Sequence, residues 1–248
     1  MLRQMNLQHA ILWLVLEALA NGAVSSSLVL HGPLPQLAPQ RLEGDLRDGA
    51  SAPALDPVTE VEWEPLRKQC RRLVATLDTL NHPVPKTTIA ALERVLRDAQ
   101  PDPDAASKKV QDLLDQYCLV NVTINPESRV KAARGPAAAA LVAGRETVVL
   151  VKVHNEAGVT HALRVGGPEI RDNQNPAKLS WLDLATHARS PLGPVLSGSR
   201  VEYRVFGLTA HQTGKREATL RFDVGQGTQD LGFRAEVPIL FHVGEATR

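Results

Sequence analysis

The clearest hydrophobic pattern of the chain lies near its C-terminal end, in the stretch from Lys215 to Val243. Two runs of alternating apolar and polar residues are separated there by a glycine-rich segment, which predicts an antiparallel hairpin with one buried face. Pro238 falls on the polar face of the second run, and because proline has no N–H it predicts an edge strand or the start of one. The residues expected on the buried face are Ala218, Leu220, Phe222, Val224, Val237, Ile239, Phe241 and Val243.

Shorter runs with the same period precede this hairpin. Residues 118–125 and 201–205 alternate apolar and polar side chains, whereas residues 146–154 are apolar on both faces and predict a central strand. Residues 159–165 follow a turn and predict its partner strand. About six strands joined by turns, with no helical pattern between them, indicate an antiparallel immunoglobulin-like or C2-like β-sandwich. We therefore expect a mainly β protein whose sandwich domain spans residues 118–244.

Upstream of the predicted sandwich the apolar residues recur with the period of an α-helix. The first amphipathic stretch begins near Glu62, the second has Thr87 or Thr88 as its N-cap, and the third begins at Asp102, an N-cap followed by proline. We expect a small segment of about three helices at residues 59–117, either as a bundle or as a brace against the sheet.

The N-terminal region carries the signals of export. Arg3 precedes an apolar run, Ala10–Ala20, of the length of a signal-peptide core, and small residues suited to cleavage follow it. That run is too short to span a bilayer core of about 30 Å, so we expect no transmembrane segment after cleavage. We predict a signal peptide at residues 1–24, a disordered linker rich in Pro, Gly and Ala at 25–58, and export to the periplasm, the cell surface or the medium. Glu17 interrupts the apolar run, which leaves an amphipathic N-terminal helix as the alternative.

Composition narrows the range of partners. The 28 Lys and Arg against 27 Asp and Glu give a formal net charge of +1, and the basic residues are spread along the chain, so we expect no nucleic-acid partner. With four Phe, two Tyr and three Trp, the chain also has few aromatic platforms for stacking bases or sugars. Cys70 and Cys118 could form a disulfide in an exported protein, or remain two reduced, buried thiols.

Residues that could bind a metal are scattered. His154 and His161 bracket a turn, and no His-x-His, HExxH or Cys-x-x-Cys motif occurs, so solvated turn histidines are the better interpretation. Carboxylates beside the hairpin loop are the candidates for a calcium site, namely Asp223, Asp230 and Glu236. The glycines of that loop are better explained by turn geometry, and we predict no metal, no cofactor and no catalytic residue.

Three segments, residues 108–137, 150–165 and 214–241, carry a family resemblance, most specifically in NPESRVK, HNEAG and GQGTQD. They resemble the N-terminal, non-catalytic region of exported CehA/McbA-type (PHP-like) metallohydrolases of planctomycete-like bacteria. In that family a separate PHP-like domain farther along the chain holds the metals through His-rich motifs. Because no His-x-His occurs here, the family's metal ligands correspond to no position of this sequence, and whether a catalytic domain is encoded downstream stays open.

These patterns together predict a non-catalytic, exported β-sandwich module that serves as an accessory, recognition or scaffold part of a hydrolase system, with a hydrolase domain or a cell-surface ligand as partner. One alternative is a metal-dependent hydrolase, or a remnant of one, with a dispersed His and Asp site. Another is an adhesion or assembly subunit that adds a strand at the Pro238 edge. The residues expected to bind a partner are Arg129, Lys131, Arg134, Asp230, Phe233 and Arg234.

Overall fold

The computed structural model of the chain describes residues 53–98, 102–171, 180–225 and 233–246, which belong to one compact unit. The predicted signal peptide at 1–24 lies outside the described residues, and so does the predicted linker up to residue 52. Within the described ranges no helix is long and apolar enough to cross a membrane. The division into a helical segment at 59–117 and a sandwich domain at 118–244 stays a prediction.

The described residues are mainly β and resemble a sandwich of two sheets, and three α-helices precede the strands in the chain. The helices are α2 (Trp63–Leu77), α3 (Lys86–Arg97) and α4 (Pro103–Leu114), and the short 3-10 helix η2 (Asp115–Tyr117) follows α4. The strands are β1 (Cys118–Ile124), β2 (Val130–Arg134), β3 (Ala140–Val142), β4 (Glu146–Asn155), β5 (Arg164–Gly166), β6 (Ile170–Arg171), β7 (Leu182–Thr186), β8 (Val201–Ala210), β9 (Gly214–Asp223) and β10 (Arg234–Gly244).

The predicted mainly β, sandwich-like fold is confirmed, but its two sheets are mixed where the prediction had an antiparallel sandwich. The six-stranded sheet has the order β2-β1-β4-β8-β7-β6, and the four-stranded sheet has the order β3-β10-β9-β5. β1 pairs with β4 in parallel, as do β6 with β7 and β3 with β10. β1 and β4 are parallel because a crossover separates them. After β2 the chain joins the other sheet as β3, and it then returns to the first sheet as β4, which runs in the direction of β1.

The predicted C-terminal hairpin is confirmed. β9 and β10 pair antiparallel from Gly214 with Val243 to Asp223 with Arg234, and the eight apolar residues expected on one face are all buried. Among the described residues, β10 pairs with β3 only over His242–Gly244. The segment of β10 around Pro238 is therefore an edge, as predicted, whereas the C-terminal end of β10 is not. The N–H of His242 donates to Ala139 on the β3 side, and alternation along the strand places Pro238 in the same outward direction. Proline therefore removes a donor from the open edge.

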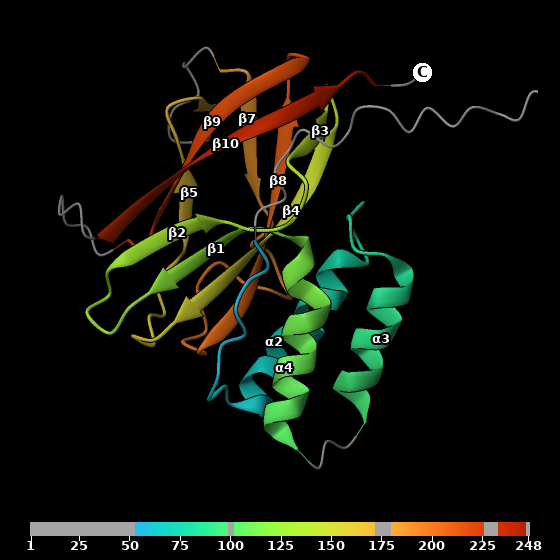
Figure 1. The fold of residues 1–248 in the computed structure, drawn as a ribbon, viewed down its shortest axis with the longest axis vertical. Helices are drawn as coiled ribbons and strands as arrows, with labels where there is room; N and C mark the ends of the chain where they lie inside the picture. Colours follow the sequence, from blue (N-terminus) through green and yellow to red (C-terminus); the bar gives the residue numbers. More distant parts are fainter. Residues whose placement is uncertain (1–52, 99–101, 172–179, 226–232, 247–248) are drawn as a thin grey trace, which may run out of the picture. The chain divides into compact units, whose positions relative to one another are not determined.

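Two hydrophobic cores are built on opposite faces of the six-stranded sheet. The core between the sheets includes Phe206, Leu208 and Ala210 of β8, whereas Val201 and Tyr203 of the same strand belong to the core shared with the helices. Figure 1 shows the three helices lying together on one side of the sheets. β4 lies between β1 and β8 and is buried on both faces, which confirms the predicted central strand.

The helix termini match the sequence in part. The side chain of Asp102 accepts hydrogen bonds of 3.0 Å from the N–H groups of Asp104 and Ala105, which confirms the predicted N-cap of α4. The predicted Thr87 or Thr88 cap of α3 is wrong, because the N-cap residue is Pro85 and no side chain caps this helix. The Thr88 hydroxyl instead lies 3.2 Å from the hydroxyl of Tyr117, which links α3 to η2.

The hairpin offers a test of the sandwich core with a matched neighbour. Phe241 is fully buried and packs edge-on against Trp181, with ring centroids 6.0 Å apart. We expect Phe241→Ala to lower the free energy of unfolding by about 3–5 kcal/mol, because it leaves a cavity between the sheets. Leu240, the adjacent residue, is 51% exposed, so Leu240→Ala is expected to cost less than about 1 kcal/mol. Urea denaturation of both variants checks this, and similar losses for the two would contradict the assigned faces.

Candidate functional site

A buried polar cluster joins the helices to the six-stranded sheet. The ammonium of Lys152, on β4, donates to Oδ2 of Asp115 at 2.6 Å, and the hydroxyl of Tyr203, on β8, donates to Oδ1 of the same carboxylate at 2.8 Å. The Lys152 and Asp115 side chains are only 1% and 10% exposed. Both carboxylate oxygens of Asp115 therefore bind strands of the sheet, and they fix η2 and α4 against it.

The electrostatics of this cluster favour a structural role. Burial raises the pKa of Asp115, while the charge of Lys152 and the two hydrogen bonds oppose that rise. Burial and the negative charge of Asp115 both hold the pKa of Tyr203 well above its usual value, so its hydroxyl stays protonated and can donate. α2 is joined to β8 by the side-chain amide of Gln69, which donates to the Tyr203 carbonyl at 2.7 Å.

A second pair of buried charges holds the β7–β8 connection, residues 187–200. Glu202 and Arg204 of β8 alternate with Tyr203 and so point to the other face of the sheet. The Arg204 guanidinium donates to the Gly193 carbonyl at 2.7 Å, and the N–H of Ser197 donates to Glu202 at 2.7 Å. Burial raises the pKa of Glu202 and lowers that of Arg204. These contacts fix the path of the connection, which lies beside α2 at both of the clefts described below.

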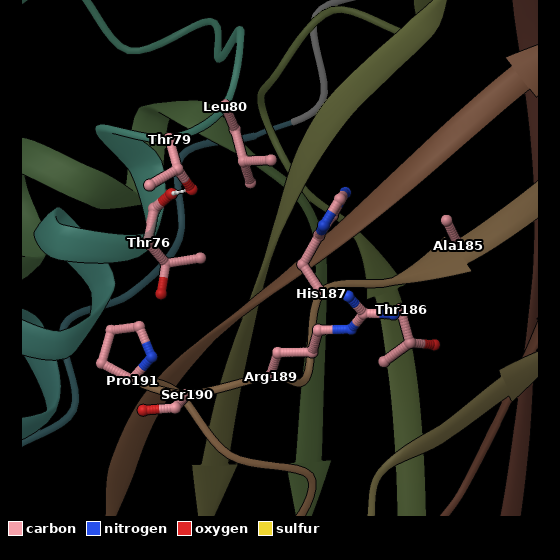
Figure 2. Close-up of a pocket in the computed structure, with 9 residues that line it drawn as sticks. All are labelled: Thr76, Thr79, Leu80, Ala185, Thr186, His187, Arg189, Ser190 and Pro191. Carbon is pink, nitrogen blue, oxygen red and sulfur yellow. Dashed lines mark hydrogen bonds between the residues drawn. The ribbon is translucent and has the colours of Figure 1, made fainter.

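The larger of these clefts opens where the helices stop covering the sheet. Its volume is about 470 Å³, and its walls come from the C-terminal end of α2 and from the segment at the end of β7. Figure 2 shows Thr76, Thr79 and Leu80, at and just after the end of α2, facing the β7–β8 connection across the cleft. The lining residues are Thr76, Thr79, Leu80, Ala185, Thr186, His187, Arg189, Ser190 and Pro191.

A histidine and a glutamate lie at the sheet side of the cleft. Nε2 of His187 is 3.0 Å from Oε1 of Glu146, the first residue of β4. The glutamate side chain reaches this position because residue 207 of β8 is glycine, where a Cβ atom would come within 2.5 Å of the Glu146 carboxyl group. Gly207 pairs with Ala185, so two small residues lie side by side where the sheet borders the cleft.

The cleft presents hydrogen-bonding groups beside apolar surface. The guanidinium of Arg189 is exposed and has no hydrogen bond or ion pair within the described part of the chain. The hydroxyls of Thr76 and Thr79 donate to backbone carbonyls of α2, at 3.0 and 2.8 Å, and keep their lone pairs as acceptors. Figure 2 shows the Ser190 hydroxyl directed away from the His187 ring, so these two do not form a nucleophile and base pair.

The basic residues predicted to bind a partner are not brought together. Lys131 and Arg134 are three positions apart on β2, so their side chains leave opposite faces of the strand. The Arg134 guanidinium donates to the carbonyls of Leu119, Gly135 and Ala137, and burial lowers its pKa. Arg129 lies in the turn before β2, where its N–H donates to the Asn125 side chain at 2.8 Å. Arg134 thus supports the strand.

The carboxylates predicted as a calcium site bind arginines. Asp223 lies 2.6 Å from the guanidinium of Arg164, and Glu236 lies 2.8 Å from that of Arg221. Asp230 lies outside the described residues, while Phe233 and Arg234 are half-buried at the start of β10. Among the described residues, no group of three or more His, Cys, Asp or Glu side chains could hold a metal ion.

The predicted histidine pair shows no shared site. Nε2 of His154 lies 3.4 Å from the Glu156 carboxylate, and no hydrogen bond to this nitrogen is present in the described ranges. Burial lowers the pKa of His154, against the opposing charge of Glu156. His161 lies in the segment before β5, where its backbone carbonyl accepts from the N–H of Leu196.

The two cysteines are free and fully buried, so the Cys70–Cys118 disulfide that the sequence left open is absent. Both belong to the core shared by the helices and the sheet. Burial raises the pKa of each thiol well above its usual value, and the negative charge of Asp115 adds to this effect at Cys118. They therefore behave as small apolar residues.

Comparisons with known proteins add little to this description. No protein-family model matches the chain, and no curated protein matches it. Among solved structures, a complex of PbICP-C with falcipain-2 aligns with 42% of this chain and 84% of that chain, at 13% sequence identity and a TM-score of 0.24. At this TM-score the likeness supports no argument about fold or function.

Sequence reasoning missed the residues that build the candidate site. The sequence offered one signal of the buried cluster, which is Lys152 inside the apolar strand of residues 146–154, since a buried lysine needs a partner. Asp115 and Tyr203 had no such signal, because each also fits an ordinary polar position in its own element. His187 and Arg189 become neighbours of α2 only through tertiary packing.

The buried ion pair predicts a large, asymmetric effect on stability. Lys152→Met leaves the Asp115 carboxylate without its counter-ion, and we expect it to lower the free energy of unfolding by about 3–5 kcal/mol. Adding Asp115→Leu should recover most of that loss, since both charges are then removed. The exposed pair Lys108–Asp112, at 2.9 Å, is the control, and Lys108→Met should cost less than about 1 kcal/mol. Equal effects of the two lysine substitutions in urea denaturation would show that the buried pair is not structural.

The buried thiols predict a simple chemical result. We expect neither cysteine to react with DTNB in the native protein, because burial keeps both as neutral thiols. After unfolding without reductant, two thiols per chain should titrate. Absence of thiols after unfolding would mean that the cysteines are oxidised, and rapid reaction before unfolding would contradict their burial.

Proposed function

We propose that the chain is a non-catalytic β-sandwich module of an exported CehA/McbA-type metallohydrolase system, and that it recognises a ligand in the cleft between α2 and the β7–β8 connection. One observation carries the recognition part of the proposal. Both walls of the cleft are hydrogen-bonded to β8: Gln69 of α2 donates to the Tyr203 carbonyl, and Arg204 donates to the Gly193 carbonyl of the β7–β8 connection, so the walls are held in place before a ligand arrives. Preformed walls lower the ordering cost of binding.

The chemistry of the walls defines the ligand class. Arg189 provides several N–H donors in a planar group that matches a carboxylate, and Thr76 and Thr79 provide acceptors. Leu80, Ala185 and Pro191 provide apolar surface beside them. The cleft therefore suits a small ligand, or the end of a peptide, that combines a carboxylate with an apolar body.

The hydrolase alternative is supported by the His187–Glu146 contact alone. A carboxylate bonded to one ring nitrogen orients an imidazole and leaves the other nitrogen to act on a proton. A general base of this kind also needs a nucleophile or a bound substrate within hydrogen-bonding reach. No hydroxyl of the described cleft residues bonds to His187.

Ligand-observed NMR with a library of small aryl and alkyl carboxylates tests the recognition proposal. We expect members of the library to bind the full chain, and to lose most of their binding to Arg189→Gln and to Ala185→Trp, which fills the cleft. Arg145→Gln, at an exposed arginine in the turn between β3 and β4, removes the same charge outside the cleft and should leave binding unchanged. Binding that survives both cleft variants, or no binding at all, would refute the proposed cleft function.

A panel of ester and phosphodiester substrates, with and without added zinc and manganese, separates the module from the hydrolase. If the module is non-catalytic, we expect the full chain to turn over these substrates no faster than the His187→Ala variant does. Turnover by the full chain that is lost in this variant would establish the enzymatic alternative. N-terminal sequencing of the mature protein tests the export part of the proposal.

A further inference from the structure

Four basic residues of α2 occur as two pairs, each with a spacing of four, and the two pairs differ in their contacts. Nε of Arg67 donates to the Leu96 carbonyl at 2.7 Å, and the Arg71 guanidinium donates to the same carbonyl at 2.9 Å. That carbonyl belongs to the last turn of α3, where the negative end of the helix dipole favours cations. Arg67 and Arg71 therefore have a clear structural role in joining α2 to α3.

The other pair, Lys68 and Arg72, lines a second cleft of about 340 Å³. Neither side chain has a hydrogen bond or ion pair with another described residue, and both are exposed. Like charges four residues apart on a helix repel each other. The cleft thus carries two cations that have no ion-pair partner among the described residues.

The wall opposite these cations is the loop Ser197-Gly198-Ser199, and its shape is fixed. Gly198 has φ +84°, and a Cβ atom there would lie 3.2 Å from the side chain of Thr160. The N–H of Ser197 is bonded to the buried Glu202. The Ser197 and Ser199 hydroxyls lie 2.7 Å apart, so one donates to the other and the second keeps a free proton.

We infer that this second cleft binds a tetrahedral oxyanion, a phosphate or sulfate group, between the two α2 cations and the serine loop. Lys68 provides an ammonium, Arg72 provides a guanidinium that matches two oxygens of such a group, and the free serine proton provides a further donor. The cleft also borders the first turn of α2, whose positive dipole end favours an anion. Glu62 lines the same cleft and opposes binding, so the affinity is moderate and sensitive to salt. The site is separate from the Arg189 cleft and does not depend on its function.

Titration of the isotopically labelled full chain with inorganic phosphate and with sulfate, followed by amide NMR at constant low ionic strength, tests the site. We expect saturable shifts at residues 197–199 and at the first turns of α2. Lys68→Gln combined with Arg72→Gln should weaken binding at least about tenfold, since two charge-assisted contacts are lost. Glu62→Gln should strengthen binding, because it removes the opposing carboxylate.

The control variant combines Lys109→Gln with Lys215→Gln, which removes the same charge from exposed positions on α4 and β9. Its affinity should match that of the unmodified chain. Thermal unfolding establishes that the α2 variant is folded, and we expect no loss of stability because neither side chain has a partner among the described residues. Equal affinity of the α2 variant and the control, titration by acetate as strong as by phosphate and sulfate, or no saturable binding would each overturn the inference. The relative affinities of phosphate and sulfate identify which group the site prefers.

Discussion

The structure depends on the buried contact of Lys152 with Asp115 and Tyr203. A charged pair removed from water is costly, and it persists only where geometry and additional hydrogen bonds satisfy both partners. Here the ammonium comes from a central strand, the carboxylate from the turn after α4, and the hydroxyl from the neighbouring strand. Because the contact needs all three elements in place, it selects one docking position of the helices on the sheet.

That docking position determines where the protein surface is open. The helices cover the outer face of β4 and β8 over Val148, Leu150 and Tyr203 and stop short of Gly207 and Ala185. The β7–β8 connection lines both clefts, and the buried side chains of Glu202 and Arg204 hydrogen-bond to its backbone. Charged residues inside the fold thus shape the surface on which we place the two binding sites.

The hydrophobic pattern of the sequence was sufficient to predict those helices and strands that have one buried face. The alternation in β9 and β10 and the period of the helices follow directly from burial, because a shift of one residue would expose the apolar face. β3 has only three residues, with Leu141 alone buried, and it lies in an alanine-rich stretch without a readable period. Yet β3 carries the crossover that makes β1 and β4 parallel. The candidate site was missed for a related reason, since its walls come from segments more than 100 residues apart in the chain, Thr76 and His187 among them.

The central claim is that the helices and the sheet unfold as one unit because buried charges and a shared core join them. Native-state hydrogen exchange of the full chain measures this directly, as the opening free energy of amides in α2 and α4 against those in β4 and β8. We expect the most protected amides of both layers to share one opening free energy, equal to that of global unfolding. A separate, lower-energy opening of the helices, with the sheet still protected, would contradict the account.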